Sequence, residues 1–137
     1  MRRLASLVCL WSFVGTATTH AQTLVLSQNK CGMDKQEQIR RMADSLWMPI
    51  AQELVNEGKL TSVGSAYHAW GDEWNVIVWY IAPNMNAFNT GFNELVTRIN
   101  QRHPALFPQF TAWCSEHKDS IYNMGRTTTA ATGPRRE

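Results

Sequence analysis

The stretch from Ser62 to Ala82 constrains the fold of this 137-residue chain more than any other, because it reads as two strands folded back on each other. Its residues, SVGSAYHAWGDEWNVIVWYIA, are apolar and aromatic on both sides of Gly71-Asp72. This pair suits a two-residue type II′ turn, which places glycine first. The turn predicts an antiparallel hairpin in which Trp70 lies opposite Glu73.

Both faces of the predicted hairpin are apolar, since directly opposed residues share a face. In this register His68 lies opposite Asn75. One face carries Gly64, Ala66, His68, Trp70, Asn75, Ile77, Trp79 and Ile81. The other carries Val63, Ser65, Tyr67, Ala69, Trp74, Val76, Val78 and Tyr80. A turn one residue longer would move each residue of the second strand to the opposite face of the hairpin, and that alternative stays open.

A strand and a helix precede the hairpin. Residues 23–30 form a short strand, and Asp34 with Glu37 three residues later has the spacing of a capping box. We expect Pro49 to kink or split the helix, and Gly58 to end it. Its apolar stripe consists of Ile39, Met42, Ala43, Leu46, Trp47, Ile50 and Leu54.

A second helix and a last strand follow. Asn84 or Asn86 can cap the helix, and His103-Pro104 ends it. Residues 105–113 read as an apolar connector broken by proline, and residues 119–124 as the last strand. The apolar stripe of this helix consists of Phe88, Phe92, Leu95, Val96 and Ile99.

The order strand, helix, strand, strand, helix, strand predicts an α+β fold, a ferredoxin-like β-α-β-β-α-β sandwich. Its four-stranded antiparallel sheet carries two helices on one face. Because both sheet faces are apolar, the face without helices needs another cover, as an exposed aromatic surface of that extent marks an interface or a ligand cavity. A homodimer that packs sheet against sheet would supply the cover.

The N-terminal 21 residues have the order of a secretory signal peptide: Arg2 and Arg3, an apolar run, then a small-residue cleavage site after Ala21, with Ala17 as the alternative. The apolar run is shorter than the roughly 20 residues of a membrane span. We therefore expect residues 1–21 to be removed and the protein to be periplasmic or secreted, without a membrane anchor. Residues 22–126 form one domain, and residues 127–137 a disordered tail.

The charge balance excludes two classes of partner. Without Arg2 and Arg3, eleven of the thirteen basic residues remain, equal in number to the eleven acidic ones. A near-neutral domain without a basic run gives no electrostatic reason to bind nucleic acid or an anionic membrane.

Two cysteines, Cys31 and Cys114, remain after signal removal, in an exported and oxidising setting. The predicted topology places both at the same sheet edge, on adjacent strands. A disulfide between them would close a long loop and, in the chain-entropy model, stabilise the fold by roughly 3–4.5 kcal/mol. Two free thiols, or a redox or metal role, are the alternatives, and the lack of a CxxC motif counts against thioredoxin-like chemistry.

The chain resembles the dimeric α/β-barrel superfamily, which includes stress-responsive barrel proteins and antibiotic-biosynthesis-type monooxygenases. The resemblance rests on the helix ending WMPIAQELVNEGKL and the hairpin YHAWGDEWNVIVWY, and covers most of Thr23 to Met124. It is greatest for uncharacterised secreted bacterial members with the hairpin H-x-W-G-D-E-W-N and a Cys-x-E-H-K-D segment, here Cys114 to Asp119. The superfamily includes haem-degrading enzymes, cofactor-free oxygenases and isomerases, so the resemblance implies a fold rather than one activity.

The candidate site lies on the hairpin. His68 could act as a base or bind a metal, and Asn75 could polarise a carbonyl or enolate, so these two are the catalytic candidates. The alternative is an interface histidine hydrogen-bonded to Asn75. The candidate ligand-binding residues are Trp70, Trp79, Ile77 and Asn29.

Other titratable residues point to no metal site. We interpret His117, with Glu116 and Asp119, as solvated loop charge at the edge that holds the cysteines. Asp72 and Glu73 could join His117 around a metal, but we predict none. The sequence requires no cofactor; haem could be accommodated but nothing indicates it.

The sequence thus predicts an exported homodimeric barrel protein that binds a small apolar or aromatic ligand, with a monooxygenase- or isomerase-type reaction as one form of that function. The alternative is a non-enzymatic structural or stress-related dimer with a filled barrel core.

Overall fold

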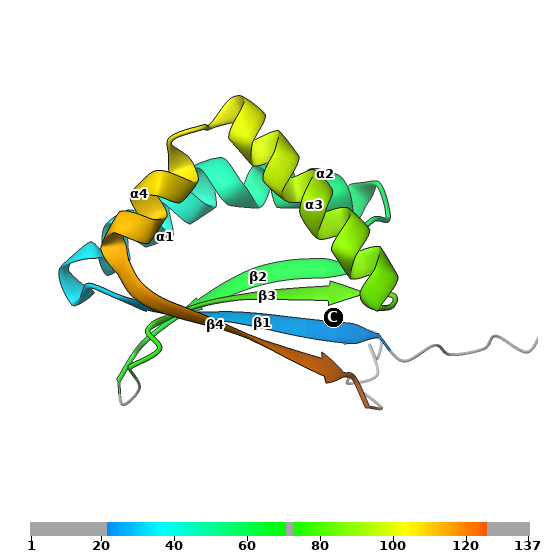
Figure 1. Ribbon diagram of the computed structural model, residues 1–137, viewed down its shortest axis with the longest axis horizontal. Helices are drawn as coiled ribbons and strands as arrows, with labels where there is room; N and C mark the ends of the chain where they lie inside the picture. Colours follow the sequence, from blue (N-terminus) through cyan, green and yellow to red (C-terminus); the bar gives the residue numbers. More distant parts are fainter. Residues whose placement is uncertain (1–21, 71–72, 126–137) are drawn as a thin grey trace, which may run out of the picture.

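The computed structural model describes residues 22–70 and 73–125. The described elements form one antiparallel sheet of four strands in the order β2-β3-β1-β4, and Figure 1 shows the labelled helices on one side of it. This is the predicted ferredoxin-like α+β fold. In chain order the elements are β1 (Thr23–Cys31), the 3₁₀ turn η1 (Met33–Lys35), α1 (Gln36–Met42), the π-helical turn η2 (Ala43–Trp47), α2 (Met48–Asn56), β2 (Ser62–Tyr67), β3 (Val76–Ala82), α3 (Met85–Arg102), α4 (Leu106–Trp113) and β4 (Cys114–Asn123).

The predicted register of the hairpin is confirmed. Ala66 pairs with Ile77, and the His68 N–H donates to the Asn75 carbonyl over 2.9 Å. Regular pairing runs from Ser62 to Tyr67, however, so His68 and Asn75 lie just beyond the strands. The predicted type II′ turn falls on residues 71–72, which lie outside the described residues.

Proline splits the first helix as predicted. The π-helical turn η2 separates α1 from α2, and Pro49, which has no N–H to donate, lies in the first turn of α2, directly after this π-helical turn. α2 ends where Gly58 takes a positive φ of 73° and its N–H donates to the Val55 carbonyl. The Lys59 N–H donates to Leu54, which completes a Schellman motif.

The predicted capping box is wrong. Lys35 precedes α1 and no side chain caps that helix, because residue 34 lies in the 3₁₀ turn and the carboxylate of Glu37 binds Arg40 and Arg41 instead. Those bonds, at 2.9 and 2.8 Å, keep Glu37 on the outer surface of the helix.

α3 begins and ends as predicted: the Asn84 side chain accepts the Ala87 N–H over 2.9 Å, and His103 follows the last turn. The connector prediction for residues 105–113 is wrong, since Leu106–Trp113 form α4. Pro108 lies in the first turn of α4, where a helix makes no use of the N–H.

The last strand is longer than predicted and begins at Cys114. Its first residues are polar and exposed, as suits an edge strand, and backbone pairing with β1 holds them rather than burial. Glu116 and His117 are therefore strand residues, and their interpretation as loop charge is wrong.

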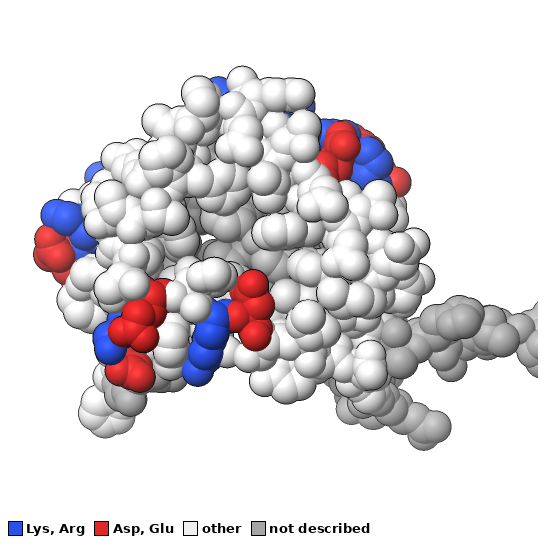
Figure 2. Space-filling model, viewed as in Figure 1, with Lys and Arg blue, Asp and Glu red and all other residues white. Residues whose placement is uncertain are grey.

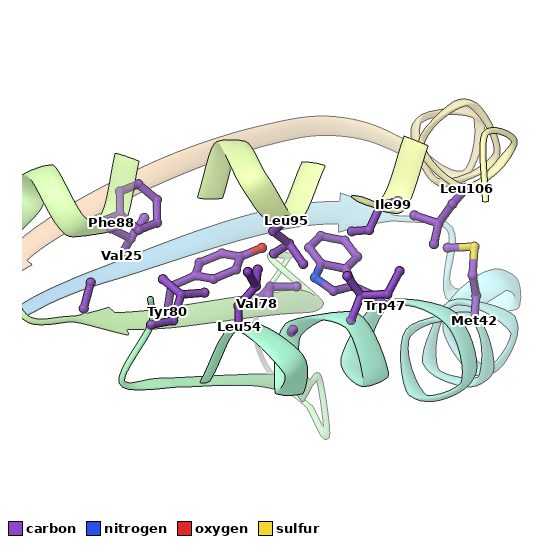
Figure 3. Close-up of a cluster of buried hydrophobic side chains, with 14 residues drawn as sticks. Val25, Met42, Trp47, Leu54, Val78, Tyr80, Phe88, Leu95, Ile99 and Leu106 are labelled. Atoms are coloured by element: carbon purple, nitrogen blue, oxygen red, sulfur yellow. The ribbon is translucent and has the colours of Figure 1, made fainter. Parts of the chain in front are cut away.

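The main core lies between the helices and the inner face of the sheet. Figure 3 shows Tyr80 and Val78 from β3 packed among Leu54, Leu95 and Ile99 of the helices. The other members of this cluster of buried residues are Val25, Met42, Trp47, Ile50, Ala51, Leu60, Ala82, Phe88 and Leu106.

The opposite face of the sheet carries no helix, as Figure 1 shows. The residues at the centre of this face are apolar. Trp79 lies against Gly64 of the neighbouring strand, where a Cβ atom would collide with the indole ring. We call this surface the open face. Its apolar side chains are Leu24, Leu26, Ile77, Trp79, Ile81 and Tyr122, none of which is buried.

The predicted signal peptide and tail, residues 1–21 and 127–137, lie outside the described residues. Among residues 22–70 and 73–125, no helix has the length and apolar character that crossing a bilayer requires.

Candidate functional site

A cavity of about 290 Å³ opens between the sheet and the helical layer. Its floor comes from β1, β3 and β4, and its roof from η2, α3 and α4. Figure 2 shows the molecular surface hollowed between the helices and the strand at the front, which Figure 1 labels β4. Its lining residues are Ser27, Asn29, Trp47, Tyr80, Phe92, Phe107, Phe110, Thr111, Cys114, Ser115, Glu116 and His117.

The roof of the cavity is aromatic. Trp47 packs edge-on against Phe107 and Phe110, with ring centroids 5.8 and 6.3 Å apart, while Tyr80 packs edge-on against Phe92 at 5.4 Å. Such walls favour a flat apolar ligand. An engineered cavity of about 150 Å³ binds benzene, so this volume suits a molecule of about two rings.

Two polar groups lie among these rings. The indole N–H of Trp47 is buried and has no hydrogen-bond partner among the described residues. Tyr80 is buried, and Figure 3 shows its hydroxyl turned toward Trp47. Burial first, and the Asp119 carboxylate second, raise the pKa of Tyr80, so its hydroxyl stays protonated. Both groups can donate a hydrogen bond to an acceptor on a ligand.

The mouth of the cavity is polar. His117 lies opposite Asn29 in the β1–β4 ladder, and both line the cavity. The His117 Nε2 atom lies 3.6 Å from a carboxylate oxygen of Asp119, two residues along the same face of β4. Asn29 itself is buried, and its amide donates to the carbonyls of Ser27 and Val76 at 3.3 and 3.4 Å.

The predicted disulfide joins Cys31 to Cys114, which confirms the pairing of the two strand ends. Cys114 also lines the cavity, directly after the last residue of α4. The Gly32 N–H donates to the Trp113 carbonyl over 2.9 Å beside the disulfide. The disulfide therefore fixes one wall of the cavity to the end of β1.

The two catalytic candidates lie close together but outside the lining of the cavity. The Asn75 amide accepts the Cys31 N–H over 2.8 Å and donates to the Cys31 carbonyl over 2.7 Å, in place of a strand neighbour. The Gln36 amide donates to the carbonyls of His68 and Asn75 at 3.3 and 3.1 Å. Asn75 is thus committed to the backbone of β1, and the catalytic roles of both residues stay predictions.

The four ligand-binding candidates are divided between the faces of the sheet. Asn29 lines the cavity on the helical side. Ile77 and Trp79 lie on the open face, and Trp70 is 89% exposed beyond the end of β2. The structure therefore does not bring Asn29 together with these three residues.

The lining of the cavity does not fit haem. His117 could approach an iron atom, but no Lys or Arg lines the described cavity to bind the two haem carboxylates. Within residues 22–70 and 73–125, no group of three His, Cys, Asp or Glu side chains could hold a metal ion.

Sequence reasoning missed most of this site. The stripe of the second helix contained Phe92, but Phe107 and Phe110 were assigned to a connector. The alternation of β4 would have placed His117 and Asp119 on one face had the strand been traced back to Cys114. Trp47 was expected in the core, and nothing in the sequence shows that its N–H lacks a partner.

No family model matches the chain, and no curated protein matches its sequence. Solved structures do share the fold. A NIPSNAP family protein from Agrobacterium tumefaciens aligns with a TM-score of 0.65 at 12% identity, over 80% of this chain and 90% of that one. A dimeric ferredoxin-like protein from an uncultured marine organism aligns with a TM-score of 0.63 at 8% identity, over 80% of this chain and 92% of that one.

A putative antibiotic biosynthesis monooxygenase from Nitrosomonas europaea aligns with a TM-score of 0.56 at 11% identity, over 77% of this chain and 91% of that one. At these identities the likeness concerns the fold. It confirms the ferredoxin-like fold that the sequence predicts.

Proposed function

We propose that this protein binds a small, flat, largely apolar molecule in the cavity between its sheet and its helices, and that it acts as a homodimer. The observation that carries the proposal is the cavity of about 290 Å³, walled by aromatic rings and containing the unpartnered indole N–H of Trp47. A buried donor without a partner is costly, and a ligand that accepts its hydrogen bond would remove that cost.

The homodimer is supported by the open face. Leu26, Ile77 and Trp79 leave an apolar surface on the side without helices, and the similar proteins include one described as dimeric. A second copy packed sheet against sheet would cover this surface and form the barrel. In such a dimer the open face is a filled interface and the ligand binds on the helical side.

Ligand titration tests the proposal. We expect 2-naphthol, a neutral two-ring molecule, to change the tryptophan fluorescence saturably. The variant Ser27→Phe, which places a ring on the cavity floor, should abolish the change, while Trp70→Ala, at an exposed position, should leave it intact. Binding that survives Ser27→Phe but is lost in Trp70→Ala would place the ligand on the hairpin instead.

A second candidate function is a monooxygenase- or isomerase-type reaction on the bound molecule. Its support is the fold shared with the putative monooxygenase and the position of His117 and Tyr80 at the same cavity. The test is conversion of candidate aromatic substrates, with oxygen uptake followed at the same time. Activity that persists in Ser27→Phe would show that the chemistry does not occur in this cavity.

We also propose that the protein is exported. The disulfide between Cys31 and Cys114 supports this proposal, because such bonds persist in oxidising compartments. The intact mass of protein recovered from the periplasm or medium should correspond to a chain that begins at Gln22. Recovery of the full-length chain from the cytoplasm alone would contradict export.

A further inference from the structure

We infer that the natural ligand is a cation: a flat apolar body that carries a protonated amine, with the amine held at the acidic mouth of the cavity. This inference rests on the proposed function, since it adds a charge to the ligand of the same site. It follows from the distribution of charge around the mouth.

No Lys or Arg side chain of the described chain lines the cavity, whereas Glu116 does, and His117, which also lines it, is paired with Asp119. Lys30 lies 3.6 Å from a Glu116 oxygen, but it is closer to Glu73, at 2.9 Å. One lysine is therefore shared between two carboxylates. Glu116 pairs with Lys30 in the β1–β4 ladder and alternates with His117, so its carboxylate lies at the side of the edge strand that faces away from the cavity.

Asp119 adds a second carboxylate. Its partner among the described residues is His117, at 3.6 Å, and its charge also reaches Tyr80 inside the cavity. Lys118 lies between His117 and Asp119 in the sequence but faces the other side of the sheet, where its Nζ atom sits 4.2 Å from the ring centre of Trp74. The nearest lysine on β4 therefore does not neutralise the mouth.

The aromatic walls of the cavity also favour a positively charged ligand. Aromatic faces attract cations, and Trp47, Phe107 and Phe110 surround the space behind the mouth. A ligand carboxylate or phosphate would instead meet the carboxylates of Asp119 and Glu116 at a cavity without Lys or Arg in its lining, where His117 is already paired with Asp119. Such an anion would lose its hydration without an ion pair to compensate.

Three indoles of similar size test the inference: tryptamine is a cation, tryptophol is neutral and indole-3-propionate is an anion. Isothermal titration calorimetry at low salt should rank their affinities in that order. Added salt should lower the affinity for tryptamine and leave the affinity for tryptophol unchanged, because salt screens exposed charges.

Variants locate the charge effect. Asp119→Asn should weaken the binding of tryptamine about two- to fivefold, as expected for a half-exposed carboxylate, and Glu116→Gln should weaken it less, because the Glu116 carboxylate is paired with Lys30. Tryptophol should bind these variants as it binds the wild type. Asp44→Asn is the matched control, because its carboxylate is 53% exposed, against 50% for Asp119, but pairs with Arg40 on the helical layer.

The outcomes separate this inference from the proposed function. Equal affinity for tryptophol and tryptamine, or tighter binding of indole-3-propionate, would overturn the cationic ligand and leave the cavity as a binding site. If no indole binds, and 2-naphthol does not bind either, the proposed function fails and this inference fails with it. If 2-naphthol binds but tryptamine does not, the cationic ligand alone is overturned.

Discussion

At the scale of single residues, Asn75 shows how a side chain can take the place of a strand. Its amide hydrogen-bonds both backbone groups of Cys31 at the point where β3 has not yet begun. Buried backbone groups rarely go without partners, so this position needs a side chain with one donor and one acceptor in this geometry.

We expect Asn75→Ala to lower the free energy of unfolding by about 1–3 kcal/mol, because it leaves the N–H and carbonyl of Cys31 without partners. Urea unfolding followed by circular dichroism measures the change. Asn100→Ala, at an exposed position of α3, is the control and should have little effect. An Asn75→Ala protein as stable as the wild type would show that water replaces the amide at no cost.

His68 provides a second test at this scale. Because it does not line the cavity, His68→Ala should leave the affinity for 2-naphthol unchanged, as measured by fluorescence titration. A large loss of affinity, with stability retained, would return His68 to the binding site.

At the scale of elements, the disulfide is the covalent link between β1 and the junction of α4 with β4. The cysteines are 83 residues apart, and the chain-entropy model gives such a loop about 4.5 kcal/mol of stabilisation. α4 supplies Phe107 and Phe110 to the cavity roof, so the same bond also holds part of the site.

We expect reduction of the disulfide, or the double variant Cys31→Ser/Cys114→Ser, to lower the urea midpoint. Hydrogen exchange should rise first in α4 and in the first residues of β4, because the Gly32–Trp113 hydrogen bond then holds this junction without the covalent link. Reoxidation of the reduced wild type should restore both properties. An unchanged midpoint after complete reduction would contradict this role.

A network of ion pairs joins α2 to α3. Arg98 binds Glu57 through two hydrogen bonds of 2.7 and 2.9 Å, and Arg102 binds Glu53 at 2.6 and 2.9 Å. The hydrogen bonds from Arg98, followed by that from Lys59, lower the pKa of Glu57 from 4.5 to about 2.

A lowered pKa in the folded state means that Glu57 stabilises the fold above pH 4.5, and that this contribution is lost as the pH falls toward about 2. We expect Glu57→Gln to be less stable than the wild type near neutral pH, and the difference to vanish in acid. Urea titrations over a pH series measure this, with high salt as a control that should reduce the difference. A difference that grows in acid would contradict the assignment.

At the scale of the whole molecule, the two sides of the sheet have different roles. The helical side contains the core and the cavity, whereas the open face leaves apolar side chains uncovered. The proposed homodimer and the proposed ligand therefore occupy opposite sides of the same sheet.

We expect Ile77→Lys to convert the dimer to a monomer, since it places a charge at the centre of the open face. Size-exclusion chromatography with light scattering measures the mass. Met85→Lys, at an exposed apolar position at the start of α3, is the matched control and should stay dimeric. A dimer that survives Ile77→Lys would move the interface elsewhere.

The fold could be predicted from the sequence because its signals are local. Alternation around Gly71-Asp72 gave the hairpin register, and the steps of three and four residues gave both long helices. Pro49 and Gly58 marked the ends of α2 through their own backbone chemistry. The cysteine pair followed once this order of elements fixed which strands are neighbours.

The candidate site could not be predicted in the same way, because it depends on which side chains meet across the sheet and on what they leave unfilled. The helix α4 was missed because Pro108 was read as a helix breaker. Proline breaks a helix only beyond the first turn, and Pro108 lies in the first turn of α4. The length of β4 was missed because pairing with β1, rather than apolar alternation, sustains it. The sequence by itself determined the elements, their order and the two apolar faces of the sheet, since these depend on local periodicity. Tertiary structure decided that the cavity lies under the helices and that Asn75 serves the backbone, because both depend on contacts between residues far apart in the chain.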